Sequence, residues 1–291
     1  MLDINGTHKE MRIFPQIRQD FTSLQNRIDA LKDGLGLRLF RPMQSAQGEE
    51  PFFRFVNSTV QALSSSQGMG IRQIGTLREA VIWTIQNVNN FQTEEEAFLA
   101  GLDKQEAPYK EVIYERFWTI LNCGVLKPCS KKIQQEKINI IDFSEVDVES
   151  QKTLAEIFLS YTWRRIQLKD LCFQPGNLVI VLDEFQNFSL KKDGILRNML
   201  REGRKFGISF VLATQTMEVF SKEALAILNQ TATRLYFRPA QSEGLKVAKE
   251  IDPSKAAEWQ KQLMRLQRGE SIAVGNLCVE DSVIRRPLLV K

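Results

Sequence analysis

Two adjacent carboxylates at the end of a short aliphatic run are the residues with the clearest chemical potential. Asp183 and Glu184 follow Leu178 to Leu182, a run that is rich in β-branched residues and too short for a helix. Such a run is typical of a strand buried on both faces of a parallel sheet. Ligands bind beyond the carboxyl ends of the strands in these sheets, so we expect both acids at a ligand site.

An apolar run followed by Asp-Glu is the Walker B pattern. In this pattern the first acid, Asp183, helps to hold the Mg²⁺ that bridges nucleotide phosphates, and the second, Glu184, polarises the water that attacks the γ-phosphate. The alternative is a core strand that ends in two solvated acids without a chemical role. The dipeptide alone is compatible with both interpretations.

A polar pair ends the next predicted strand, which covers Ile208 to Thr214. Gln215 stands at the tip of this strand, next to Thr214, where its amide can contact the γ-phosphate or the attacking water. The alternative is a glutamine in an ordinary turn. Because the pair and the two acids follow successive strands, we favour the functional interpretation.

Basic residues gather near the end of the helix predicted over Asp193 to Phe206. Arg201, Arg204 and Lys205 are candidates for a finger that enters a neighbouring subunit and stabilises charge on the transferring phosphoryl group. The alternative is a solvated basic helix end, which also suits the helix dipole.

Composition excludes several classes of protein. The 291 residues include 39 basic and 35 acidic side chains, so the overall charge is only faint support for a polyanionic partner. The four cysteines form no C-x-x-C pair and there is one histidine, so neither a zinc site nor a disulfide framework is expected. With no signal peptide and no apolar run of membrane-spanning length, we expect a cytoplasmic protein without a membrane segment.

Strands and helices alternate in the second half of the chain. The order β-α-β-α-β-α-β predicts a parallel sheet with covering helices. The elements that give this order are a strand at 137–143, a helix at 151–168, the strand at 178–182, the helix at 193–206, the strand at 208–214, a helix at 218–229 and a strand at 233–237. Helices at 242–251 and 253–267 and strands at 270–274 and 283–290 complete the prediction.

The first half of the chain is predicted to be mostly helical. Apolar spacing predicts a helix over Phe14 to Leu31, and a short strand is expected at Leu37 to Phe40 before a polar loop at 42–51. Further helices are predicted at 52–63, 77–88, 97–102 and 109–122. Thr76 and Glu79 have the spacing of a capping box for the second of these.

Several motifs together resemble the second half of a HerA/FtsK-type ATPase, a superfamily that includes the type IV secretion and conjugation coupling ATPases. The motifs are L-V-I-V-L-D-E-F-Q-N-F, R-E-G-R-K-F-G-I, V-L-A-T-Q-T and L-N-Q-T-A-T-R-L-Y-F-R. I-N-I-I-D-F-S-E-V, L-R-E-A-V and the L-D-I-N-G at residues 2–6 are also similar, the last to the family's second strand. The resemblance covers nearly the whole chain and is most specific from residue 137 onward.

The resemblance implies an α/β fold, a RecA-like P-loop NTPase core with a mostly parallel sheet flanked by helices. Residues 1–291 would form one partial RecA-like ATPase domain. Within it, residues 52–130 would be a mostly helical insertion, and residues 137–291 would be the α/β core that contains Walker B.

The resemblance also assigns roles to the candidate residues. Asp183 would be the acid on the Mg²⁺ side with Glu184, the catalytic acid, nearby; Gln215 would sense the γ-phosphate beside Thr214 at the nucleotide. Arg204 would be the finger supplied to a neighbouring subunit, with Arg201 second. ATP and Mg²⁺ are the implied cofactors, and the implied assembly is a homo-hexameric ring around double-stranded DNA, with a nuclease or another DNA-processing protein as a further partner.

One departure from the family is plain. The 291 residues contain no G-x-x-x-x-G-K-[ST], the loop whose backbone and lysine cradle the phosphates. The sequence therefore predicts a DNA translocase subunit without its P-loop, with truncation, a split gene or a misplaced start favoured over loss of function. The alternative is a non-catalytic DNA-binding or ring-interaction module derived from such an ATPase.

Overall fold

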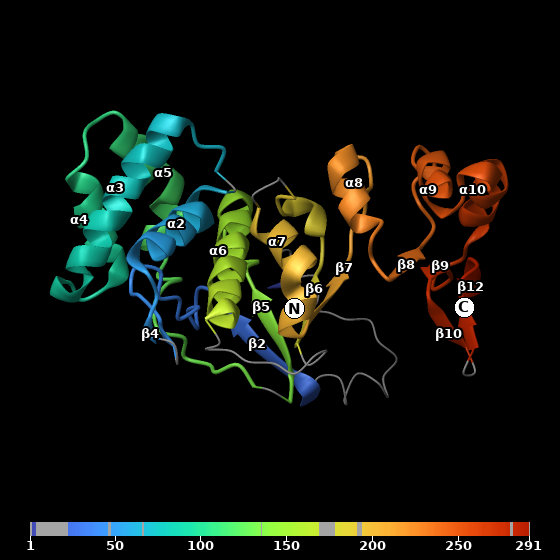
Figure 1. Ribbon diagram of the computed structural model, residues 1–291, viewed down its shortest axis with the longest axis horizontal. Coiled ribbons are helices and arrows are strands. Elements are labelled where there is room, and N and C mark those ends of the chain that lie inside the picture. Colours follow the sequence, from blue (N-terminus) through green and yellow to red (C-terminus); the bar gives the residue numbers. More distant parts are fainter. Residues whose placement is uncertain are drawn as a thin grey trace. The chain divides into compact units, whose positions relative to one another are not determined.

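The computed structural model describes residues 2–3, 23–45, 48–65, 67–134, 136–168, 178–190, 194–279 and 282–290 (Figure 1). The chain divides into two compact units, Met1–Ala213 and Thr214–Lys291. Each unit has its own main sheet and, in addition, one two-stranded antiparallel pair.

The sheet of the first unit has five strands in the order β2-β5-β1-β6-β7. All four strand pairs are parallel, so the carboxyl ends of the strands meet at one edge. The predicted parallel sheet is therefore confirmed for this unit. Its strands are β1 (Leu2–Asp3), β2 (Gln25–Asp29), β5 (Ile138–Asp142), β6 (Leu178–Leu182) and β7 (Ile208–Leu212).

The helices of the first unit fall into two sets. Four of them precede β5 in the sequence and form one group, and two others follow β5 and β6. In Figure 1 the group lies together in blue and green, while α6 and α7 lie in front of β5 and β6. The group consists of α2 (Phe52–Ser64), α3 (Ile71–Asn87), α4 (Glu94–Asp103) and α5 (Tyr109–Asn122), with the 3₁₀ turn η2 (Val88–Asn90). The pair is α6 (Val148–Gln167) and α7 (Ile195–Glu202), and η3 (Phe185–Asn187) and η4 (Gly203–Phe206) are short 3₁₀ turns.

The helix predicted over Phe14 to Leu31 is wrong in its second half. Residues Gln25–Asp29 form β2, which pairs with β5 along its whole length. Buried and partly exposed side chains alternate along β2, and Ile28 is 2% exposed. Pairing with a buried neighbour has outweighed the helical spacing of the apolar residues. Residues 14–22 lie outside the described part of the chain.

Two further local predictions are wrong. Residues 37–40 form no strand, and the polar loop that follows contains a small hairpin, β3 (Gln44–Ser45) with β4 (Gly48–Glu49). Helix α3 begins at Ile71, and the side chain of Gln73 accepts the N–H of Gly70 before the first turn. The hydroxyl of Thr76 instead donates to the carbonyl of Arg72 within the helix.

The second unit packs helices on an antiparallel sheet with the order β12-β9-β8. Its core contains Val247, Leu263 and Ile272, with Met217 and Trp259 packed against them. The elements are α8 (Lys222–Leu228), β8 (Thr233–Tyr236), α9 (Gly244–Ile251), η5 (Pro253–Lys255), α10 (Ala256–Arg265), β9 (Ser271–Gly275), β10 (Leu277–Val279), β11 (Ser282–Ile284) and β12 (Leu288–Val290).

The last strand of the predicted parallel order is wrong in its pairing. β8 pairs antiparallel with β9, with Thr233 opposite Gly275 and Tyr236 opposite Ile272. The alternation of elements indicated a strand at this position but did not indicate that it pairs with β9. The first four residues of β9 are all buried, which makes it a good partner for β8.

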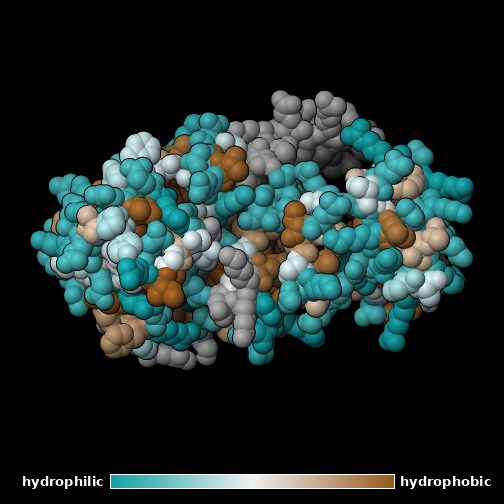
Figure 2. All heavy atoms as spheres, turned by 90° about the horizontal axis from the view of Figure 1, so that it is seen from above, coloured by the Kyte–Doolittle hydropathy of each residue, from teal (hydrophilic) through white to brown (hydrophobic). Residues whose placement is uncertain are grey.

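Hydrophilic residues cover most of the face seen in Figure 2, with hydrophobic residues in small groups among them. Such a mixture is ordinary for a protein surface in contact with water. Among the residues that the structure describes, no helix is both long and apolar enough to cross a membrane.

Candidate active site

Asp183 and Glu184 leave the sheet at the carboxyl end of β6, as the sequence predicts. The five residues of β6 pair with the five of β7, and Leu182 lies opposite Leu212. Beyond the strands, Ala213 donates its N–H to the carbonyl of Leu182 at 2.9 Å, and Phe185 donates to the carbonyl of Ala213, also at 2.9 Å. These two bonds fix the turn that carries both acids.

Glu184 has a left-handed backbone, with φ 50° and ψ 44°. It is the only non-glycine residue with positive φ in the described part of the chain. A side chain in this conformation costs about 1–3 kcal/mol and persists where the surrounding structure enforces it. Here Phe185 and Phe188 are buried directly after it, at 3% and 5% exposure, and they fix the chain on that side.

Both acids are accessible and differ in their immediate surroundings. Asp183 and Glu184 are partly exposed. One carboxylate oxygen of Asp183 accepts the N–H of Glu184 at 3.0 Å. This bond orients Asp183 toward its own turn, while the left-handed backbone of Glu184 redirects the second side chain. The two carboxylates therefore do not alternate from face to face as side chains on a regular strand do.

The donor set suits a magnesium ion that is shared with a phosphate ligand. Mg²⁺ is usually held by one or two carboxylates together with phosphate oxygens and water. Asp183 supplies such a carboxylate, and Glu184 is adjacent. No cluster of three or more His, Cys, Asp or Glu side chains suited to a metal ion exists within the described ranges.

Thr214 and Gln215 begin the second unit, directly after Ala213. The hydroxyl of Thr214 donates to the carbonyl of Thr216 at 2.8 Å, and the N–H of Thr216 returns to that hydroxyl at 3.3 Å. Thr214 thus closes a local turn around Gln215. The side chain of Gln215 is exposed at the tip of this turn.

Glu243 holds this loop, and sequence reasoning missed it. The residue is buried, with 5% of its surface exposed. One oxygen accepts the hydroxyl of Thr216 at 2.6 Å, the N–H of Met217 at 2.9 Å and the N–H of Glu218 at 3.2 Å. In the sequence, Glu243 stands at the start of a predicted helix, where an acid is expected for its effect on the helix dipole alone.

A second side chain of α9 supports the same loop. The amine of Lys246 donates to the carbonyl of Met217 at 2.8 Å. The side chain of Met217 packs against the core of the second unit. The loop that follows Gln215 is therefore anchored by a carboxylate, an amine and an apolar side chain.

The basic candidates lie at the other end of the strands. Arg204 and Lys205 are exposed in η4, which leads into the amino end of β7, and Arg201 is exposed at the end of α7. The side chain of Phe206 anchors η4 by an edge contact with Trp163, with ring centroids 5.0 Å apart.

The length of the strands separates these cations from the acids. Five residues of strand span about 16 Å, so Arg204 and Asp183 face opposite edges of the sheet within one chain. The structure thus brings Asp183 and Glu184 together and does not bring Arg201 or Arg204 to them.

Comparison with known protein families matches residues 177–251 to a family described as the TraM recognition site of TraD and TraG. The matched segment contains both acids of the β6 turn, Gln215, both arginines and Glu243. All candidate residues therefore fall within one segment of shared sequence.

Curated relatives of the chain are two DNA double-strand break repair helicases named HerA. The protein from Saccharolobus solfataricus is 22% identical over 167 residues, which cover 53% of this chain and 32% of the relative. The protein from Sulfurisphaera tokodaii is 22% identical over 168 residues, which cover 55% of this chain and 32% of the relative. The match thus spans about a third of the length of these relatives.

Solved structures share the fold over almost the whole chain. VirB4 of Thermoanaerobacter pseudethanolicus gives a TM-score of 0.67 at 12% identity, covering 94% of this chain and 78% of that one. The bacterial conjugative coupling protein TrwB gives a TM-score of 0.54 at 11% identity, covering 91% of this chain and 77% of that one. The α/β, RecA-like fold class is confirmed by these matches, and the resemblance to the superfamily of P-loop conjugation and translocase ATPases is confirmed by the three comparisons together.

Proposed function

We propose that this chain is part of an ATP-dependent DNA translocase of the HerA/FtsK type, in which residues at the end of β6 hydrolyse ATP. The observation that carries the proposal is the Asp183–Glu184 turn at the carboxyl edge of a parallel sheet, in which Glu184 has a left-handed backbone. The shared fold and the similarity to HerA support the DNA-motor class.

In the proposed mechanism each acid has one task. Asp183 would hold the Mg²⁺ that accompanies the nucleotide, which would supply positive charge next to the transferring phosphoryl group. Glu184 accepts a proton from the attacking water as the water oxygen bonds to the γ-phosphorus and the bond from that phosphorus to the leaving oxygen of ADP breaks. Gln215 orients this water or the γ-phosphate by a hydrogen bond, and the turn closed by Thr214 holds it in place.

Phosphate binding needs a loop that residues 1–291 do not contain, because they lack G-x-x-x-x-G-K-[ST]. We propose that this loop is supplied beside β7. Among the described residues, β7 is an edge strand of the sheet, and Val179 and Val211 on one face of β6 and β7 are each 51% exposed. A further strand and helix at this edge would cover that apolar face.

We further propose that the protein acts as a homo-hexameric ring on double-stranded DNA in the cytoplasm. The position of Arg204 supports a ring, because a finger that faces away from its own acids can serve only a neighbouring subunit. A nuclease or another DNA-processing protein is the proposed partner of this assembly.

The test is ATP hydrolysis by the full-length protein that contains residues 1–291, measured with and without duplex DNA. We expect Mg²⁺-dependent turnover that DNA stimulates. A protein that binds DNA and hydrolyses no ATP would instead be the non-catalytic DNA-binding or ring-interaction module that the sequence left open.

A further inference from the structure

A pocket of about 550 Å³ lies in the first unit, outside the Asp183–Glu184 turn. It is bordered by the segment after β2, the loop at 124–133, the start of α4 and one side of α6. Apolar side chains such as Ile28, Leu37 and Phe158 form part of its lining. Six basic side chains line it against two acidic ones, and the six are Arg38, Arg41, Lys127, Lys131, Lys132 and Arg165.

Two glycines bring the walls of this pocket into direct backbone contact. Gly34 and Gly36 have left-handed backbones, with φ 74° and 62°. A Cβ at Gly34 would lie 2.6 Å from Cγ and 2.7 Å from the carbonyl oxygen of Lys127. The N–H of Gly36 donates to this carbonyl at 3.0 Å, and the N–H of Leu35 donates to the carbonyl of Val125 at 2.8 Å. Segments about 90 residues apart are therefore fixed against each other.

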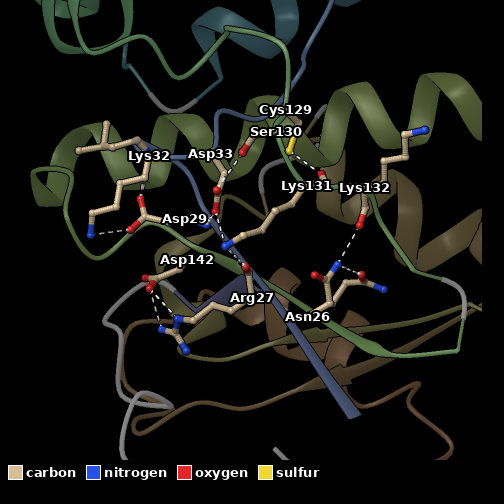
Figure 3. Close-up of polar contacts among 12 residues, drawn as sticks. Asn26, Arg27, Asp29, Lys32, Asp33, Cys129, Ser130, Lys131, Lys132 and Asp142 are labelled. Carbon is tan, nitrogen blue, oxygen red and sulfur yellow. Dashed lines mark hydrogen bonds and ion pairs between the residues drawn. The ribbon is translucent and has the colours of Figure 1, made fainter. Parts of the chain in front are cut away.

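A polar network fixes the basic loop on β2, as Figure 3 shows. The amide of Asn26 donates to the carbonyl of Lys132 at 2.9 Å. The hydroxyl of Ser130 donates to a carboxylate oxygen of Asp33 at 2.9 Å. The amine of Lys131 lies 2.9 Å from the other oxygen of Asp33 and 3.0 Å from the carbonyl of Arg27. The loop that carries the cations is thus held before any ligand binds.

Arg38 and Lys132 differ from the other basic side chains of the pocket. Arg41, for comparison, lies 3.5 Å from Glu94, and the amine of Lys127 donates to the carbonyl of Leu31 at 2.8 Å. Within the described ranges, the side chains of Arg38 and Lys132 have no hydrogen-bond or ion-pair partner, and both residues are exposed. In Figure 3 the amine of Lys132 points away from the network.

We propose that this pocket binds the phosphate backbone of a nucleic-acid strand, with Arg38 and Lys132 as the phosphate contacts. The excess of basic side chains complements a polyanion, and phosphate contacts from Lys and Arg supply most sequence-independent affinity for nucleic acids. The apolar lining accommodates the sugar or base between two phosphates. This contact is independent of ATP hydrolysis at the β6 turn.

The test is the salt dependence of nucleic-acid binding by the full-length protein without ATP. Fluorescence anisotropy with a labelled single-stranded oligonucleotide, and separately with its duplex, gives the slope of log K against log salt concentration. We expect Arg38→Ala and Lys132→Ala each to reduce this slope by about 0.7 for a single strand or about 0.9 for a duplex. At 0.1 M salt, relative to 1 M, these slope changes correspond to a loss of affinity of about fivefold for a single strand and about eightfold for a duplex.

Matched controls separate this site from general charge. Arg78→Ala and Lys104→Ala remove one exposed cation each outside the pocket, and we expect the wild-type slope from both. Arg38→Glu should lower affinity further than Arg38→Ala. Thermal unfolding checks that every variant is folded.

The proposal is overturned if Arg38→Ala and Lys132→Ala bind as Arg78→Ala and Lys104→Ala do, or if the wild-type protein binds neither single strand nor duplex. The form of nucleic acid whose slope falls by the expected amount in both variants is the form that occupies the pocket. A protein that shows the predicted slopes and no ATP turnover would support this pocket and contradict the proposed motor function, so the two failures are distinguishable.

Discussion

At the scale of single residues, the backbone of Glu184 gives a prediction about stability. Glycine adopts the left-handed conformation without the cost of about 1–2 kcal/mol that a side chain meets there. We therefore expect Glu184→Gly to be more stable than Glu184→Ala by about 1 kcal/mol, although both lose the carboxylate. Chemical denaturation measures the difference. An alanine variant as stable as the glycine variant would show that the turn at Glu184 is not strained.

Glu243 should position the loop after Gln215 through its buried carboxylate. Glu243→Ala leaves the donors of Thr216, Met217 and Glu218 without their acceptor. Loss of hydrogen bonds to a charged group costs about 1.5–3 kcal/mol. Thermal unfolding measures this cost, and Glu243→Gln, which keeps an acceptor oxygen, should lose less. Glu258→Ala, at an exposed acid, is the matched control. Equal stability of the Glu243→Ala and Glu258→Ala variants would mean that the hydrogen bonds to Glu243 contribute nothing to the stability of the folded protein.

The sequence predicted that the two acids follow the end of a strand, but it predicted neither their geometry nor their support. The position of Asp183 and Glu184 follows from one aliphatic run and its end. The left-handed turn depends on the bond between Phe185 and Ala213, which are distant in sequence. Glu243 accepts hydrogen bonds from a loop 25 or more residues earlier in the chain, and the sequence around Glu243 does not predict contacts over such a distance.

At the scale of elements, predictions succeeded where local pattern and burial agree. β6 is a continuous aliphatic run, and α5 has apolar residues on one face, so the bounds of both were predicted to the residue. β2 was missed because only two of its five residues are buried, and its other positions are polar. Its conformation is set by β5, a partner more than 100 residues away.

The pairing of β2 and β5 gives a prediction about pH. Arg27 contacts a carboxylate oxygen of Asp142 at 2.7 Å, and Ser144 donates its N–H to the other oxygen at 3.0 Å. Burial favours a higher pKa for Asp142, but the hydrogen bonds from Ser144 and Arg27 outweigh it, and the pKa is lowered. The folded protein therefore holds this proton less tightly than the unfolded chain, whose Asp pKa is about 3.9. The resulting stability is present above that pH and is lost as the pH falls through the folded pKa.

We expect Asp142→Asn to lower the free energy of unfolding by about 1–3 kcal/mol at pH 7. The difference from wild type should begin to shrink as the pH falls below about 4, where Asp142 of the unfolded chain takes up its proton, and should continue to shrink as the pH falls through the lower pKa of the folded protein. Denaturant unfolding at pH 7, 5 and 3.5 measures it. Asp103→Asn is the control, because that side chain is 83% exposed. A difference that is constant across this pH range would contradict the assigned pKa shift.

At the scale of the whole molecule, the opposite placement of Arg204 and Asp183 predicts complementation between subunits. Arg204→Ala and Asp183→Ala should each abolish most ATP hydrolysis, since fingers of this kind are worth about 10³–10⁵ in kcat. Mixed rings contain interfaces with both groups intact, so mixing the two proteins should restore part of the rate. Mixing Asp183→Ala with Glu184→Gln is the control, because each of their sites lacks one acid. Recovery in the control, or none in the first mixture, would refute a finger supplied across the interface.

The central claim is that the carboxylate of Glu184 activates water for attack on ATP. Its most direct measurement is the single-turnover rate of ATP hydrolysis by full-length Glu184→Gln with DNA, compared with wild type and with Glu258→Gln. Glutamine keeps the size of the side chain but accepts no proton, so we expect a rate lower by about 10²–10⁴ with ATP binding retained. A Glu184→Gln rate within about a factor of two of wild type would contradict the account.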